Sequence, residues 1–220
     1  MASQRRGFEA QLEELDHLLL KMGRIAEEML NNALLALARR DLALADLTVR
    51  MDDQVDQLNH QVEVRCMQLI ATQQPAARDM RIIFSASHIC GEVERVADYA
   101  VDIALTAKRL ADRPLFKPLV DIPRMQELVK EMLRESLEAF VTRDLNLIQK
   151  MIAADDEVDH LYRYLHEELI DFMKKDSGLV EQAVHLLLIA RYLERIADHI
   201  TNIGERVFYV ETGELKELHS

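Results

Sequence analysis

The chain has 220 residues, of which 49% are hydrophobic, and it contains only 6 Gly and 4 Pro. This length allows a substantial core, and the shortage of turn-forming residues leaves little room for linkers, which favours helices. The formal net charge of -12 disfavours nucleic acid as a direct partner, because phosphate contacts need Lys and Arg on one face, and it suits cations or a basic protein surface.

The sequence has no features of a secreted or membrane-spanning protein. The two cysteines, Cys66 and Cys90, lie within helical patterns and have no metal-ligand spacing, so we expect reduced thiols in the core. No apolar run typical of a signal peptide follows the N-terminus, and no stretch of about 20 apolar residues is long enough to cross a membrane. These observations predict a cytoplasmic protein.

Apolar residues at helical spacing predict six helices along the chain. The patterns place them near residues 12–37, 44–69, 76–107, 125–140, 145–175 and 179–210. The second helix should end before Pro75, because the residue that precedes a proline avoids the helical region. Three prolines at positions 114, 118 and 123 mark the one credible break in the chain.

The two halves of the chain are copies of one unit. Arg40-Asp41-Leu42 returns 103 residues later as Arg143-Asp144-Leu145, and the Glu94–Asp98 segment returns 100 residues later as Glu194–Asp198. The sequence therefore predicts an all-α protein made of two tandem, pseudo-symmetric three-helix bundles. The predicted units are residues 1–112 and 121–211, and residues 212–220 are expected to be a frayed tail.

Each half carries two pairs of carboxylates spaced four residues apart, one on its second helix and one on its third. The pairs are Asp52/Asp56 and Glu94/Asp98 in the first half, and Asp155/Asp159 and Glu194/Asp198 in the second. Like charges four apart on a helix repel each other, so the matched repetition of such pairs points to a bound cation. If the two helices pack antiparallel, four carboxylates converge in each half, which suits divalent cations or small oxo-bridged iron clusters. One turn further, Asp102 and Asn202 add an oxygen to the same faces.

Other interpretations of these acidic residues stay open. Acidic pairs on amphipathic helices are usually solvated, although solubility does not explain four pairs at equivalent positions. Glu157-x-x-His160 has the spacing of di-iron proteins, but it has no counterpart in the first half, and we interpret it as chance. The chain has no Gly-rich phosphate loop and no motif that sets a nucleophile beside a base, so we expect no enzymatic activity.

Four segments together resemble the PhoU family of bacterial phosphate-signalling regulators. They are Gln74–Arg81, Glu94–Asp98, Arg40–Leu42 and Leu193–Ile203, and the resemblance extends from about Phe8 to Tyr209. It implies two symmetric three-helix bundles that hold metal clusters, with the four carboxylate pairs as ligands and iron, zinc or manganese as the metal. Ala97 and Ala197 stand where the family often has Gly, and Tyr99 and Asp102 stand where it often has His and Asn.

The resemblance also implies a function. It is that of a cytoplasmic adaptor, often a homodimer and peripheral to the membrane, that restrains the phosphate-starvation response. Such an adaptor links the ATPase subunit of the phosphate ABC transporter to a sensor histidine kinase. Two alternatives remain at this point: a carboxylate-bridged metal storage or redox protein, which would need inward Glu-x-x-His pairs, and a structural bundle with solvated acidic faces.

Overall fold

The computed structural model describes residues 2–218, with side chains from residue 7 onward. This part of the chain contains six long α-helices, one short 3-10 turn at Ser177–Leu179, and no strand. The helices are α1 (Ala2–Arg39), α2 (Leu42–Gln73), α3 (Ala77–Arg109), α4 (Asp121–Thr142), α5 (Leu145–Lys175) and α6 (Val180–Thr212). The predicted fold class is confirmed, although α1 begins well before the apolar stripe that predicted it.

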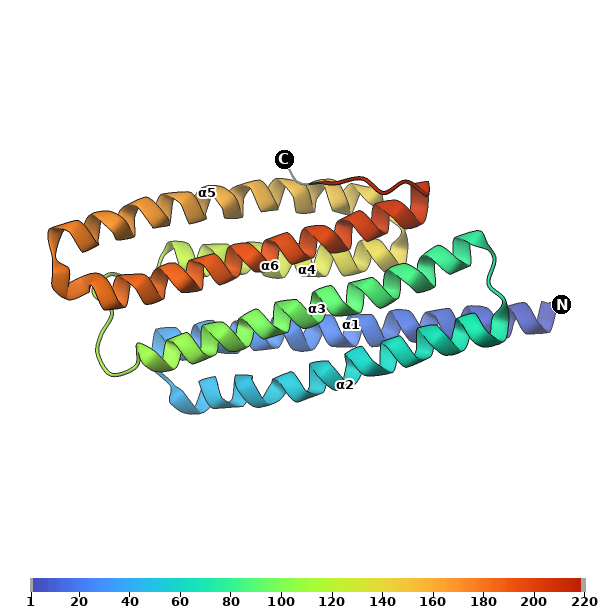
Figure 1. Cartoon of the computed structure of the whole chain (residues 1–220), viewed down its shortest axis with the longest axis horizontal. Coiled ribbons are helices and arrows are strands. Elements are labelled where there is room, and N and C mark those ends of the chain that lie inside the picture. The colour runs from blue at the N-terminus through green and yellow to red at the C-terminus, as the bar shows by residue number, and fades with distance from the viewer. Residues whose placement is uncertain (1, 219–220) are drawn as a thin grey trace.

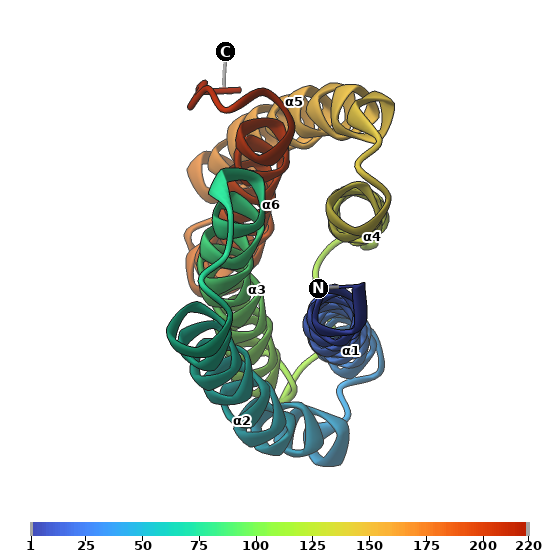
Figure 2. The ribbon, with the colours of Figure 1, turned by 90° about the vertical axis from the view of Figure 1, so that its right-hand side faces the viewer.

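The helices form two three-helix bundles that pack side by side. Helices α1, α2 and α3 contact one another, as do α4, α5 and α6. Contacts of α3 with α6 and of α1 with α4 join the two bundles. Viewed along the helices, α2, α3, α6 and α5 follow an arc, and α1 and α4 lie on its inner side (Figures 1 and 2). No helix in residues 2–218 is long and apolar enough to cross a membrane.

The repeated Arg-Asp-Leu segments form the corners between the first two helices of each bundle. Arg40 and Arg143 adopt the left-handed conformation, with φ of 55° and 64°, and this ends the preceding helix. The next residue caps the following helix: Asp41 accepts a hydrogen bond from the backbone N–H of Leu44 (3.0 Å). Asp144 does the same for the N–H of Asn146 (2.9 Å). The repeat therefore preserves a local structure as well as a pattern of apolar residues.

The two bundles share one continuous apolar core. Gly23 lets α1 approach α4 closely, because a Cβ at this position would collide with the side chain of Leu137. Gly204 on α6 has a similar role, since a Cβ there would lie 2.7 Å from Cε of Met151. Both cysteines are free and buried, as predicted.

The seam between the bundles is the line along which α3 packs on α6, and polar contacts hold both of its ends. At one end, Arg78 of α3 donates to Glu211 of α6 over 3.1 Å. At the other, the Gln182 side chain donates to the carbonyl oxygen of Pro114 (3.0 Å), in the segment that connects the bundles. After α6 the chain turns back, and the N–H of Leu218 donates to Glu205 (3.0 Å). The predicted frayed tail is thus described up to residue 218, and its last two residues lie outside the described part.

Candidate carboxylate metal sites

The four carboxylates of the first bundle lie within electrostatic reach of one another between α2 and α3. Burial, followed by the charges of Asp56 and Asp98, raises the pKa of Asp52 to about 6. The pKa of Glu94 is also raised, first by burial and then by the charge of Asp98. Since Asp52 and Asp56 belong to α2 while Glu94 and Asp98 belong to α3, the packing brings together the pairs that the spacing suggested.

One arginine neutralises part of this first cluster. Arg95 contacts Asp98 through Nη1 and Oδ2 (2.9 Å), and its Nε lies 3.6 Å from Oε2 of Glu94. Oδ1 of Asp52 is buried and has no hydrogen-bond partner, which is costly for a carboxylate oxygen. The first site therefore retains an unsatisfied acceptor and excess negative charge.

The second bundle repeats this arrangement with more positive charge. Burial raises the pKa of Glu194, the charge of Asp198 raises it further, and nearby arginines lower it. Arg191 pairs with Glu194, and Arg195 lies 3.4 Å from Asp198. Oε2 of Glu194 is nevertheless buried without a partner. On α5, the charge of Asp159 also raises the pKa of Glu194. The half-buried Asp155 lies one turn before Asp159 on the same helix.

Asp102 and Asn202 lie at the seam between the bundles. Nδ2 of Asn202 donates to Oε2 of Glu92 on α3 (3.2 Å), and Nδ1 of His199 lies 2.7 Å from the same oxygen. The charge of Asp102 raises the pKa of Tyr192 on α6, after the larger effect of burial. Each residue thus reaches the opposite bundle, and its role as a metal ligand stays a prediction.

Sequence reasoning missed the network of Glu92, His199 and Asn202. The sequence did contain a signal for this network, which was a break in the repeat. Tyr192 occupies the position equivalent to Glu92, and Tyr99 occupies the position equivalent to His199. Burial raises the pKa of Glu92, but the hydrogen bonds from His199 and Asn202 outweigh it and leave the pKa lowered. Glu92 is therefore held in its charged form between the bundles.

The donor chemistry of both sites fits a hard or borderline cation. Each site offers carboxylate oxygens on two helices, including one buried oxygen without a partner. As the side chains stand, no three His, Cys, Asp or Glu side chains within the described residues are close enough to hold a metal ion together. The ligand sets predicted from the sequence therefore stay predictions.

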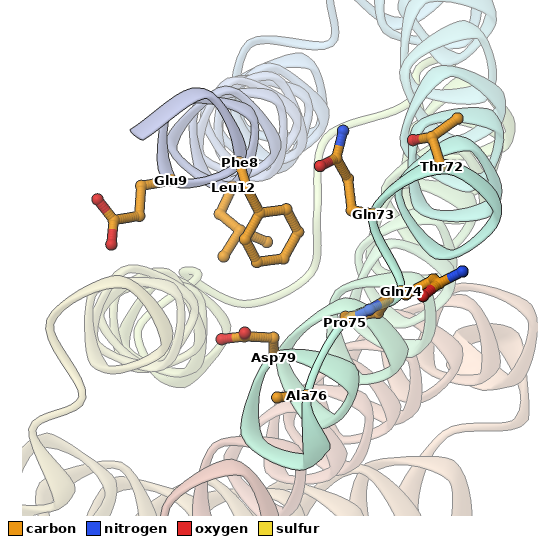
Figure 3. A pocket seen from close by; sticks show the side chains of 9 residues that line it. All are labelled: Phe8, Glu9, Leu12, Thr72, Gln73, Gln74, Pro75, Ala76 and Asp79. Atoms are coloured by element: carbon orange, nitrogen blue, oxygen red, sulfur yellow. The ribbon is translucent and has the colours of Figure 1, made fainter. Parts of the chain in front are cut away.

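The larger hollows of the surface lie away from these carboxylates. One of about 420 Å³ lies between the start of α1 and the α2–α3 connection, where Phe8 and Leu12 face Gln73 and Asp79 (Figure 3). Another, of about 430 Å³ and mainly apolar, runs between α1 and α4 and is lined by Leu20 and Leu137 among others. Neither hollow is lined by a residue of the four pairs.

Comparison with known proteins identifies the family. A model of the PhoU domain matches twice, at residues 19–107 and 122–207. The chain belongs to the PhoU family. The two matches to the PhoU domain lie in the two three-helix bundles, so the resemblance seen in the sequence is confirmed.

PhoU proteins from several bacteria match the chain over nearly its whole length. The "phosphate-specific transport system accessory protein PhoU homolog" of Clostridium acetobutylicum is 38% identical over 98% of this chain and 99% of its own. Its counterpart from Aquifex aeolicus is also 38% identical, over 93% of each chain. The crystal structure of PhoU from Pseudomonas aeruginosa has a TM-score of 0.89 at 33% identity, covering 94% of this chain and 100% of that one. The "phosphate transport system regulatory protein PhoU" of Streptococcus pneumoniae has a TM-score of 0.88 at 32% identity, covering 95% and 99%.

Proposed function

We propose that this protein is a cytoplasmic negative regulator of the phosphate-starvation response. It links the ATPase subunit of a phosphate ABC transporter to a phosphate-sensing histidine kinase, as a homodimer at the inner face of the membrane. The observation that carries the proposal is the double PhoU match, together with relatives named as accessory or regulatory proteins of phosphate transport that align from end to end.

The chemistry of the chain favours a binding protein over an enzyme. Burial raises the pKa of Cys66 and Cys90 to about 12, so neither thiol is a ready nucleophile at neutral pH. The raised pKa values of Asp52, Glu94 and Glu194 belong to the two acidic clusters, and neither cluster includes a nucleophile beside a base. The PhoU family is generally non-enzymatic, which agrees with a role in binding and signalling.

We also propose that the two carboxylate clusters bind metal ions. Asp52, Asp56, Glu94 and Asp98 would hold an ion in the first bundle, supported by Asp102. Asp155, Asp159, Glu194 and Asp198 would hold one in the second, supported by Asn202. A bound cation such as iron, zinc or manganese would turn the repulsion between carboxylates on neighbouring helices into attraction. The protein itself supplies the buried, unpaired oxygens of Asp52 and Glu194.

The alternative of a metal storage or redox protein has little support in the geometry. Its only sequence signal was Glu157-x-x-His160, and both residues are exposed. Oε1 of Glu157 accepts hydrogen bonds from Arg124 (2.9 and 3.1 Å) instead of facing the bundle core. Oxidation of added ferrous iron by the purified protein would favour this alternative, and a failure to oxidise iron would disfavour it.

The regulatory proposal is tested by deleting the gene from its host. Phosphate-starvation genes should then be expressed in phosphate-rich medium, and a copy of the gene at another locus should restore repression. Transcripts of the phosphate-starvation genes are the measurement. If they stay at the wild-type level in rich medium, the proposed role is wrong.

A further inference from the structure

A groove of about 280 Å³ lies between α2 and α3 of the first bundle. Its lining residues are Glu63, Cys66, Met67 and Ile70 from α2, with Ile83, Phe84 and Ser87 from α3. Three of its large apolar side chains are unusually exposed: Met67 by 62%, Phe84 by 48% and Ile70 by 40%. Neighbouring apolar side chains exposed to this degree mark an interaction surface.

The helix faces that line this groove lead along α2 and α3 to the carboxylate cluster. At spacings of three and four residues, Ser87 is followed on α3 by Gly91 and Glu94, and Glu63 on α2 is preceded by Asn59 and Asp56. A Cβ added at Gly91 would meet no atom within 4 Å, so the space above it is open. Oδ1 of Asn59 is buried without a partner. The stretch from Asp56 to Ile70 is about 20 Å long, which matches four turns of a bound helix.

The second bundle fills the equivalent space with its own side chains. Arg191 stands at the position of Gly91, and Tyr162 at the position of Asn59. The Arg191 guanidinium lies 5.7 Å from the centre of the Tyr162 ring and pairs with Glu194. The Tyr162 ring centre lies 6.1 Å from that of His166, which replaces Glu63. The second bundle thus indicates which groups suit the groove of the first bundle. They are a basic side chain beside the glutamate and a large ring next to that side chain.

We propose that the α2–α3 groove of the first bundle binds a helical segment of a partner protein. The segment places a basic side chain over Gly91, beside Glu94, and a large apolar side chain between Met67 and Phe84. Charge complementarity selects this occupant, because Glu63 lines the groove, Asp56 and Glu94 follow on the same helix faces, and all three attract a basic segment. A second copy of this chain, with a net charge of -12, and an anionic membrane surface are both repelled by the same acidic border.

A variant that copies the second bundle tests the proposal. Gly91→Arg with Asn59→Tyr fills the groove from within, because the introduced guanidinium can pair with Glu94 as Arg191 pairs with Glu194. The probe is a labelled synthetic peptide of about 16 residues, or four to five helical turns, with Arg, Leu and Phe on one face. Fluorescence anisotropy in the presence of a chelator should show that the variant binds the peptide at least about tenfold more weakly than the wild type. The chelator keeps the result independent of metal binding.

Matched controls separate loss of docking from loss of folding. Replacing Gly by Arg within a helix raises its intrinsic helix propensity by about 1 kcal/mol, so the melting temperature should not fall. Arg191→Gly, the reverse change in the second bundle, should leave the affinity of the first groove for the peptide unchanged. Phe84→Asp should weaken binding as strongly as the filled groove does, and a peptide with Glu in place of Arg should not bind.

Three results would overturn the proposal. The first is no binding of the basic peptide to the wild-type protein. The second is equal affinity for the wild type and the groove-filled variant. The third is sedimentation showing that Gly91→Arg converts a dimer into a monomer, since a second copy would then be the occupant of the groove.

Discussion

The first bundle sets one arginine among its carboxylates, whereas the second sets two. Among the residues whose side chains are described, Arg95 is the one arginine paired with Glu94 and Asp98, while Arg191 pairs with Glu194 and Arg195 with Asp198. The acidic pairs are therefore the same in both halves, whereas the number of arginines beside them differs. The first cluster consequently keeps more uncompensated negative charge, which a metal ion or a partner's basic side chain would neutralise under the two proposals above.

The seam between the bundles shows a second contrast at equivalent positions. On one side the charged Glu92 accepts hydrogen bonds from Asn202 and contacts His199. On the other, the rings of Tyr99 and Tyr192 pack at an angle of 32° with their centres 5.8 Å apart. The same helix crossing is therefore held by a polar network at one place and by aromatic packing at the other.

The largest expected effect is on metal content. Glu94→Gln with Asp98→Asn should remove the metal from the first bundle only, and Glu194→Gln with Asp198→Asn from the second only. Elemental analysis of protein purified without chelator or affinity tag should show about half the wild-type metal in each variant, as two independent sites would give. Because a ligand that binds only the folded state stabilises it, removing the metal should also lower the melting temperature.

Two results would contradict the metal sites. A wild type that carries no transition metal, with a melting temperature unchanged by added iron, zinc or manganese, would favour solvated acidic faces. A variant that keeps its full metal content would place the ligands elsewhere.

The next largest effect is expected at the polar side of the seam. Glu92→Ala leaves His199 and Asn202 without their shared acceptor, so the free energy of unfolding should fall by about 1–3 kcal/mol. Urea denaturation monitored by circular dichroism measures this. The matched change Tyr192→Phe keeps the aromatic packing and should cost less. If both variants lose the same stability, the polar network contributes nothing beyond packing.

A smaller change in the free energy of unfolding, this time an increase, is expected when Asp52 is replaced in the metal-free protein. Its pKa in the folded state, about 6, lies above the ordinary value of 3.8, so the folded state binds the proton more tightly than the unfolded state. Asp52 therefore lowers stability progressively as pH rises from about 4 to about 6, and the loss is complete above that range. Asp52→Asn should raise the free energy of unfolding at pH 7 by roughly 1 kcal/mol, a figure reduced for solvent screening of a half-buried group.

The exposed neighbour Asp53 is the control for this prediction, and Asp53→Asn should change stability little at either pH. The gain from Asp52→Asn should shrink at pH 4 and should disappear when metal is bound. A gain of the same size at pH 4 and pH 7 would show that the charge of Asp52 is not its cause.

The smallest effect is expected at the end of the seam. Arg78 is exposed and pairs with Glu211, so Arg78→Ala should cost at most about 1 kcal/mol, with the loss reduced in high salt. Arg113 forms the corresponding pair with Glu181 at the opposite end, and Arg113→Ala is the matched variant. Thermal denaturation measures the stability of both variants. If one variant loses well over about 1 kcal/mol and the other does not, the ion pair at that end holds the bundles together.

The sequence predicted what depends on positions within one helix or on the repeat itself. Helical spacing identified six helices, and the i, i+4 carboxylates indicated faces that lie near one another once α2 packs on α3. It did not predict that Asn202 contacts Glu92, because spacing defines a face of a helix without showing which neighbour covers it. The packing of α6 on α3 belongs to the joining of the bundles, which no local pattern encodes.

Glu92 and Tyr192 occupy equivalent positions of the two repeats but differ in chemistry, so the contact between the bundles is not symmetric. In a homodimer of single bundles, an isologous interface would use each residue twice, so an acid at this position would appear on both sides of the axis. Linking both bundles in one polypeptide removes that requirement, and Glu92 can meet His199 while Tyr192 meets Tyr99. Fusion thus allows equivalent positions to carry different residues, and one chain can present two different surfaces to two different neighbours.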